Sequence, residues 1–405
     1  MKTTSALSAR SRAAFSGLAV TALAAGALTA CGSSKSAKSE PSQAAAASSS
    51  PAGDPHKAVV TVTAAGGCAV DHTDFPAGQV TFDISNKDAT AVSEIELQSG
   101  QRIIGEKENL PPGFNGSFTV ALEAGSYSLV CPGSGQPTRQ LTVTGAASTS
   151  ADADLSTLLT QGAKEYKTYV DTQVGYLVQT TQALDSSLKG ADLVAAQKAY
   201  MKARPYYEKI EPVAESFAVG NDDLDKALDA RADDVPPAEW AGFHRIEKGL
   251  FEDKSLAGLA AYGDALVTDV QKLQGLTAAL EYKPFELANG AQELLDEVSK
   301  TKVTGEEERY SHIDLLDFQS NVEGSEQAFA DLRPALQKID PALTGTIADA
   351  FSALDKLLDT YRTGDNPSGF VLYGTLKDTD KPKLVAAVKA VQEPLSQVAA
   401  KVTKA

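Results

Sequence analysis

The chain has 405 residues, with 37 basic and 53 acidic side chains and a formal net charge of −16. A chain this acidic repels the phosphates of nucleic acids and attracts cations, so we expect no nucleic-acid partner. Its length is sufficient for two or three domains with hydrophobic cores.

The first thirty residues predict a signal peptide. Three basic residues precede an apolar run over residues 13–27, which is too short to span a bilayer. Small residues then lead to Cys31 in the pattern of a bacterial lipobox, which predicts cleavage after residue 30 and lipidation of Cys31. Without residues 1–30 the formal charge becomes −19, because only basic residues are lost. We therefore expect export, with a lipid anchor on the outer face of the cell membrane.

Residues 31–56 are mostly Ser, Ala, Pro, Gly and Lys, and they predict a disordered tether because they offer little apolar surface. Residues 57–145 alternate between apolar and polar positions, which is typical of half-buried strands. The alternation is clearest at Val60, Val62, Val80, Phe82, Ile84, Phe118, Val120, Tyr127 and Leu129. Turns rich in Pro and Gly separate these runs and favour an all-β sandwich. Residues 146–153 form a second small-residue linker.

Residues 154–405 predict an all-α domain, because apolar residues recur three and four positions apart. The spacing is clearest at Leu155, Leu158, Leu159, Leu354, Leu357, Leu358, Tyr361, Leu384, Val388, Val391 and Leu395. Within this domain, residues 204–212 (RPYYEKIEP) and 333–341 (RPALQKIDP) share Arg-Pro, Lys-Ile, an acid and Pro at the same spacing. Two related halves of the domain would explain this echo, and a chance match is the alternative.

The helical domain also contains candidate metal ligands. His244 and Glu247 lie three residues apart, so a helix would place both on one face, and Glu208 and Glu211 repeat this spacing. A single acidic stripe is usually a solvated helix face. The combination favours a metal site, because two of the four histidines lie within acidic clusters.

The types of ligand indicate the metal. Carboxylates with one imidazole form a hard, oxygen-rich site, which suits ferric or ferrous iron, manganese or calcium. A zinc protease would have the motif HExxH, whereas this chain has only HxxE. A ferritin-like di-iron bundle would have two ExxH motifs. A mononuclear site that holds metal without turning it over is the simpler prediction.

Several motifs in order resemble the imelysin-type domain of the EfeO and EfeM family, the iron-binding components of Efe iron-uptake systems. They are HRIEKGLF (244–251), RPYYEKIEPVAE (204–215), LDARADD (228–234) and GEEERYSHIDLLDFQ (305–319). The resemblance covers the whole helical half and implies two four-helix bundles with a metal site around HxxE. Carried over residue by residue, it implies as metal ligands His244, Glu247, Glu208, Glu211, Asp225 and Glu307.

The β-domain is similar to the N-terminal cupredoxin-like domain of EfeO-type proteins. A blue-copper site needs two histidines, a cysteine and usually a methionine, and this segment has only His72. With Cys31 assigned to lipid, Cys68 and Cys131 remain, and in an oxidising location two such cysteines usually form a disulfide. The resemblance offers an alternative, in which these two thiolates and Glu94 or Glu96 bind copper or iron.

The sequence therefore predicts a multidomain chain, in which a cupredoxin-like sandwich is followed by an imelysin-type domain. The function expected from the resemblance is capture of iron outside the cytoplasm and its delivery to a membrane iron permease, with a haem-type peroxidase as a further partner. The alternative is a secreted metallohydrolase, an imelysin-type peptidase that uses the HxxE motif. We expect no enzymatic activity, since no catalytic set stands out, and no cofactor besides iron and, in the β-domain, copper.

Overall fold

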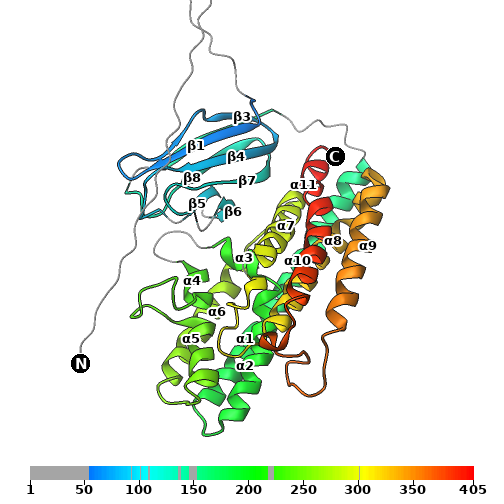
Figure 1. Ribbon diagram of the computed structural model, residues 1–405. Helices are drawn as coiled ribbons and strands as arrows, with labels where there is room; N and C mark the ends of the chain where they lie inside the picture. Colours follow the sequence, from blue (N-terminus) through cyan, green and yellow to red (C-terminus); the bar gives the residue numbers. More distant parts are fainter. Residues whose placement is uncertain are drawn as a thin grey trace, which may run out of the picture. The chain divides into compact units, whose positions relative to one another are not determined.

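The computed structural model (Figure 1) describes residues 54–92, 94–100, 102–107, 110–135, 138–145, 153–217, 223–300 and 302–405. The predicted signal peptide, the predicted lipidation residue Cys31, most of the predicted tether and residues 146–152 lie outside these ranges. Among the helices that are described, none is both long enough and apolar enough to cross a membrane.

The β-domain consists of two sheets that enclose one core. The strands are β1 Lys57–Thr63, β2 Gly67–Val70, β3 Asp74–Pro76, β4 Gly78–Asn86, β5 Ile95–Ser99, β6 Arg102–Lys107, β7 Asn115–Leu122, β8 Gly125–Val130 and β9 Arg139–Thr144. Among the described residues, one sheet has the order β2-β1-β4-β7 and the other has the order β3-β9-β8-β5-β6. Strands β1 and β4 pair in parallel, as do β3 and β9, and the other pairs are antiparallel.

The alternation of the sequence explains the sandwich. In β4 every second residue is buried, from Val80 through Phe82 to Ile84, because successive side chains point to opposite faces of a strand. Phe82 stacks on Phe118 of the neighbouring strand β7, with ring centroids 4.9 Å apart. The predicted all-β sandwich is confirmed.

The second domain is helical. Its α-helices are α1 Ala153–Leu188, α2 Leu193–Glu208, α3 Glu211–Glu215, α4 Leu224–Asp229, α5 Gly242–Glu247, α6 Ala260–Ala278, α7 Pro284–Lys300, α8 Asp314–Ile339, α9 Pro341–Asp359, α10 Asp380–Leu395 and α11 Val398–Val402. A π-helical turn, η2 Lys248–Glu252, continues α5, and short 3₁₀ turns lie at η3 Lys302–Thr304 and η4 Tyr373–Thr375.

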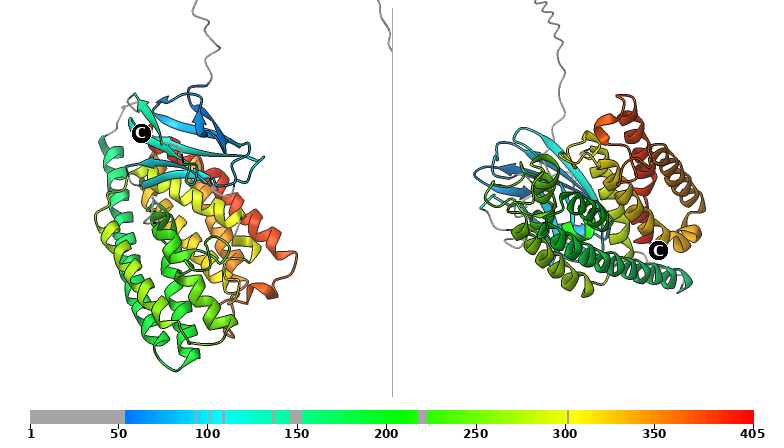
Figure 2. Two further views of the ribbon diagram at one scale, coloured as in Figure 1. Left: turned by 90° about the vertical axis from the view of Figure 1, so that its left-hand side faces the viewer. Right: turned by 90° about the horizontal axis from the view of Figure 1, so that it is seen from below.

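The helices pack as two bundles, as Figures 1 and 2 show. In the first bundle α1 lies against α2 and α6, and α5 with η2 contacts α6 and α2. In the second bundle α7 packs on α8 and α10, while α9 packs on α8 and α10. Helix α8 also contacts α1 and α2, so a single apolar core runs through both bundles. The predicted all-α domain of two helical bundles is confirmed.

The two copies of the sequence echo occupy equivalent junctions between helices but different environments. Residues 204–212 end α2 and begin α3, and residues 333–341 end α8 and begin α9. Arg204 in the first copy is completely buried, whereas Arg333 in the second copy is exposed. The shared local sequence therefore lies at a helix junction in both places, while Arg204 of the first copy, unlike Arg333 of the second, is part of a buried polar cluster.

Candidate metal centre

The candidate metal ligands gather in the helical domain from segments that are far apart in the sequence. Helices α2 and α3 contribute Glu208 and Glu211, α4 contributes Asp229, and α5 contributes His244 and Glu247. The segment between η3 and α8 contributes Glu307 and Glu308, and α8 contributes Asp317. Except for Asp229, which is slightly more exposed, all these side chains are buried.

Glu247 fixes the orientation of the His244 ring. One oxygen of its carboxylate accepts hydrogen bonds from the backbone N–H groups of Tyr310 (2.8 Å) and Ser311 (2.7 Å). The other oxygen lies 3.3 Å from Nδ1 of His244, one helical turn earlier on α5. A carboxylate anchored in this way sets the ring plane and leaves the opposite nitrogen, Nε2, directed away from it.

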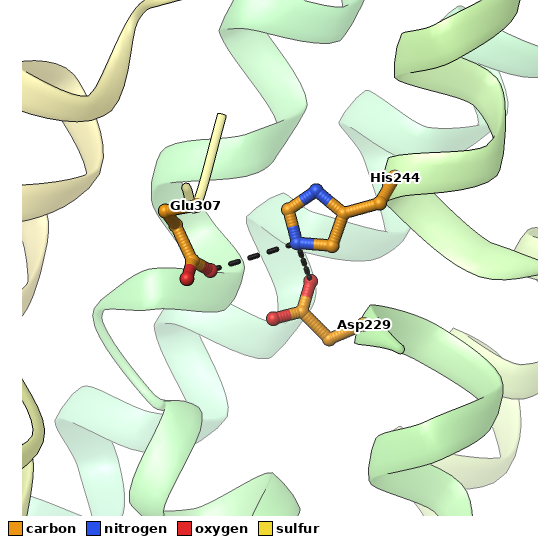
Figure 3. A group of neighbouring side chains, drawn as sticks. All are labelled: Asp229, His244 and Glu307. Atoms are coloured by element: carbon orange, nitrogen blue, oxygen red, sulfur yellow. Dashed lines mark ion pairs between the residues drawn. The ribbon is translucent and has the colours of Figure 1, made fainter. Parts of the chain in front are cut away.

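Nε2 of His244 faces two carboxylates from other elements (Figure 3). It lies 3.4 Å from Asp229 and 3.5 Å from Glu307. At these distances Nε2 has no hydrogen-bond partner, although it is buried. The three ligand atoms all lie within 4.8 Å of one another. A buried nitrogen between two carboxylate oxygens is a donor set that one metal ion could join.

A buried arginine stands at the centre of the acidic cluster. The guanidinium group of Arg204 donates to Asp229, to Glu307 at 2.9 Å and to Asp317 at 3.1 Å. It also forms ion pairs with Glu208 at 2.5 Å and Glu308 at 3.3 Å. Burying so many carboxylates would be very unfavourable without a cation among them, so Arg204 makes the cluster compatible with folding.

A second cation, Lys302, lies between Glu208 and Glu211. Its ammonium group donates to Glu208 at 3.1 Å and, at closer range, to both oxygens of Glu211. The amide of Asn321 on α8 donates to the same two carboxylates, at 2.8 and 2.9 Å. The two glutamates do not share one helix, because Glu208 ends α2 and Glu211 begins α3. They lie close together across the break between these helices.

The pKa values show how the cluster distributes its charge. Burial raises the pKa of Glu308 well above its usual range, and Glu247 and Asp317 reinforce this shift. Burial likewise raises the pKa of Asp317 well above its usual range, with Glu208 adding to the effect. For Glu307 burial is outweighed by Lys302, His244 and Arg204, which hold its pKa well below the usual range. The cations of the cluster therefore favour the ionised form of Glu307, whereas burial favours the protonated forms of Glu308 and Asp317.

Of the predicted ligands, five lie in this cluster and one lies outside it. Groups of side chains that could hold a metal ion include His244, Glu247, Glu208, Glu211 and Glu307. Asp225 belongs to none of these groups, and its carboxylate accepts a hydrogen bond from the Tyr207 hydroxyl. Asp229, one helical turn further along α4, is the acid of that helix that lies beside His244. Because residues four apart lie on the same face of a helix, the spacing of Asp225 and Asp229 could have indicated Asp229 as an equal candidate.

A small pocket leads to the histidine. Its lining includes His244, Glu247 and Glu307, together with Arg231, Trp240 and Tyr310. The pocket is small, with roughly the space that one water molecule needs. Arg231 at the pocket is partly exposed and lies 3.3 Å from Glu307. The pocket therefore lies against the imidazole and the Glu307 carboxylate.

Gly242 sets the distance between the helices that carry Asp229 and His244. It begins α5 with a φ of +74°, and a Cβ atom at this position would lie 2.1 Å from the carbonyl oxygen of Leu228 on α4. Gly242→Ala should therefore lower the free energy of unfolding by at least about 1–2 kcal/mol through backbone strain and collision. Denaturant unfolding measures this change. The variant should also bind metal more weakly than the wild type.

Gly275 provides the matched control for this substitution. It lies within α6, where a Cβ atom would meet no atom within 4 Å apart from the adjoining residues and backbone of its own helix. Gly275→Ala should increase stability by up to about 1 kcal/mol, because alanine is the better helix former. Equal effects of the two substitutions would contradict the role given to Gly242.

In the β-domain Cys68 and Cys131 are joined by a disulfide, with Cα atoms 6.2 Å apart. It connects β2 of one sheet with the residue after β8 of the other. Glu96 is buried in β5, where burial raises its pKa to about 7 against the opposing hydrogen bond from Gln98. Glu94 precedes the same strand. Among the described residues, these side chains form no group that could hold a metal ion, so copper or iron in this domain stays a prediction.

The disulfide predicts a specific result in solution. The two cysteines are 63 residues apart, so cross-linking them restricts the unfolded chain, and its loss should cost the β-domain about 2–5 kcal/mol. Intact mass should fall by two hydrogens relative to the dithiol, with no alkylation before reduction. Free thiols that copper or iron protects from alkylation would instead favour the metal alternative.

Comparisons with known proteins agree with both domains. The family model of imelysin matches residues 162–398, and that of the cupredoxin-like domain matches residues 24–143. A protein of Escherichia coli described as iron uptake system component EfeO is 39% identical over 328 residues, which cover 80% of this chain and 85% of that protein. A protein of Shigella flexneri with the same description has the same identity and coverage.

Proposed function

This chain belongs to the imelysin family and to the EfeO group of iron-uptake components, and we propose that it captures iron for delivery to a membrane permease. Iron uptake is the role stated in the description of its relatives. The capture site, the permease and the location of the chain are parts of our proposal.

The observation that carries the proposal is the arrangement around His244. Metal-ligating histidines usually donate one ring N–H to a carboxylate, which orients the ring and leaves the other nitrogen for the metal. Glu247 lies within reach of Nδ1, and Nε2 faces Asp229 and Glu307 without a hydrogen-bond partner of its own. We therefore propose Asp229, His244 and Glu307 as ligands, and Glu247 as the residue that positions the imidazole.

The chemistry of these donors suits iron. Two carboxylates and one imidazole form a hard set that matches ferric or ferrous ions, and no thiolate is present among the grouped ligands to favour zinc or cuprous copper. Glu208 and Glu211 extend the set with further oxygen donors. Holding the ion, rather than a reaction at it, is the proposed role.

Delivery requires a location close to a permease. We propose that Cys31 is lipidated, that the chain is anchored at the outer face of the cell membrane, and that a haem-type peroxidase acts in the same system. The acidic surface charge would concentrate cations near the anchored protein. Mass spectrometry of the membrane fraction, with Cys31→Ala as the control, tests the anchor separately from metal binding.

Metal titration of the purified protein tests the capture function. We expect saturable binding of iron supplied as ferric citrate, with no cleavage of a peptide library by the loaded protein. Elemental analysis of protein purified without chelators should find iron. Peptide cleavage that is lost in His244→Ala would instead support the metallohydrolase alternative.

Binding should also depend on pH in a specified direction. Burial lowers the pKa of His244, but Asp229, Glu247 and Glu307 outweigh it and raise this pKa to about 10. In the metal-free protein the imidazole is therefore protonated at neutral pH, and a metal ion must displace that proton before it can bind Nε2. Affinity should increase by up to about tenfold for each pH unit between pH 5.5 and 8.5.

Isothermal titration across this pH range, in buffers of different ionisation enthalpy, measures the protons released. Release of about one proton for each bound ion is the expected result if His244 is a ligand. Affinity that does not change with pH would exclude the imidazole from the coordination shell.

A further inference from the structure

We propose that Lys302 is a resident cation of the metal centre, which occupies the carboxylates of Glu208 and Glu211 when the site is empty and which cargo must displace. The inference rests on the proposed function, because it concerns the affinity of the same centre for iron. Lys302 would then lower the affinity of the centre for iron and assist release of the ion.

The contacts of Lys302 resemble those of a bound ion. Its ammonium nitrogen lies 3.1 Å from Glu208, closer still to both oxygens of Glu211, and 3.8 Å from Glu307. Only 3% of the side chain is exposed. The ammonium group is therefore held by oxygen atoms on several sides and is shielded from water.

The same carboxylates could surround a metal ion. Oxygens of Glu208, Glu211, Asp229 and Glu307 all lie within 4.8 Å of one another. This set shares Asp229 and Glu307 with the His244 group, so the two sets are adjoining halves of one centre. A metal ion in the histidine half can gain Glu208 and Glu211 as ligands only if the ammonium group leaves them.

Arg204 contacts some of the same acids but cannot exchange in this way. Its planar guanidinium is completely buried and is bound to carboxylates of its own helix and of three other segments of the chain. Lys302 has a compact charge on a flexible four-carbon stem, and it belongs to a short 3₁₀ turn between α7 and α8. In the proposed exchange its ammonium group moves away through rotation about the bonds of this stem. Arg204 is thus the permanent counter-ion of the cluster, and Lys302 is the exchangeable one.

Exchange has an effect on both loading and unloading. Two cations about 4 Å apart repel each other enough, at the effective dielectric of a protein, to disfavour joint occupancy more than tenfold. Displacing Lys302 therefore weakens the binding of every cation to the centre. When the cargo departs, the ammonium returns to Glu208 and Glu211, so the empty centre does not keep unpaired carboxylates and release is easier.

The test compares metal affinity in the full-length protein and in charge variants. Lys302→Gln removes the resident cation and should tighten binding of Fe³⁺, supplied as ferric citrate, and of Mn²⁺ by about tenfold or more. Lys302→Arg keeps the charge and should show no gain. Lys383→Gln is the matched control, because Lys383 is 58% exposed and pairs with Asp380, outside the centre. It changes the net charge equally and should leave affinity unchanged.

The outcomes separate this inference from the proposed function. Saturable binding by the wild type with equal or weaker binding by a folded Lys302→Gln protein would overturn the resident cation and leave the capture function intact. No binding by any of the proteins would overturn both.

Stability of the metal-free variant provides a second measurement. Lys302→Gln should melt at a lower temperature without metal, and Mn²⁺ should raise its melting temperature by more than it raises that of the wild type. If the variant does not fold alone, refolding with Mn²⁺ should restore it, because the metal supplies the missing positive charge. A purely structural lysine predicts no such rescue, and failure of Mn²⁺ to restore folding would sink the inference.

Discussion

Replacing Arg204 with methionine should lower the free energy of unfolding of the helical domain by about 3–5 kcal/mol. Methionine keeps much of the aliphatic packing of the arginine stem, so the loss measures mainly the missing charge and its hydrogen bonds. Asp229, Glu307, Asp317, Glu208 and Glu308 would lose the cation that they share. Without that cation the ionised forms of these buried carboxylates would be less favourable, so some of them would take up protons. Urea unfolding followed by circular dichroism measures the change.

Arg333→Met is the control that the chain itself provides. Arg333 occupies the same position in the second copy of the echo, is followed by proline in the same way and is exposed. Its replacement should change stability by no more than about 0.5 kcal/mol. If both substitutions had the same effect, the cost would come from the helix junction and not from the buried carboxylates.

Removal of the His244 side chain should cause the largest loss of metal affinity. His244→Ala removes the nitrogen ligand, so only the carboxylates of Asp229 and Glu307 remain of the three proposed ligands. Loss of a residue that only orients a ligand typically weakens metal binding by 10–100-fold, so loss of the ligand itself should cost at least about 100-fold. The measurement is the dissociation constant for ferric citrate, with folding checked by circular dichroism.

Two further variants sharpen this result. Glu247→Gln should weaken binding by about 10–100-fold, because the amide orients the ring less firmly than the carboxylate. His72→Gln should have no effect, since His72 lies in the β-domain, where its ring pairs with Asp71. If His244→Ala kept the affinity of the wild type, the ion would have to bind at the carboxylates of Glu208 and Glu211 instead.

The order of the domains and their secondary structure could be predicted because the relevant signals are local. Alternation of apolar and polar residues, as at Val80, Phe82 and Ile84, indicates a strand with one buried face. Apolar residues three and four positions apart indicate a helix with one buried face. The parallel pairing of β1 with β4 carries no comparable signal, because it depends on contacts between distant residues.

The candidate site could be predicted only in part for the same reason. Motifs located His244, Glu247, Glu208, Glu211 and Glu307, which the structure gathers into one cluster. The choice between Asp225 and Asp229 depends on the rotation of α4 against α5, and that rotation is fixed by the close approach at Gly242. The resemblance had assigned Asp225, whereas Asp229 is the acid beside the imidazole.

The two cations could not be predicted from spacing at all. Arg204 lies one helical turn before Glu208, but nothing local shows that it also reaches Asp317, 113 residues further along the chain. Lys302 is 94 residues from Glu208, in a segment that carries no distinctive motif. Charge compensation inside a protein is a property of the assembled fold, and sequence patterns report it only when both partners share an element.

Since the donors come from segments that meet only after folding, an unfolded chain offers iron no more than scattered single carboxylates. Iron then binds the native state almost exclusively and shifts the unfolding equilibrium by mass action. At a free iron concentration one hundred times the dissociation constant, the native state gains about 2.7 kcal/mol. A loaded molecule should consequently outlast an empty one in the presence of proteases, so cargo would lengthen the working life of the protein that carries it.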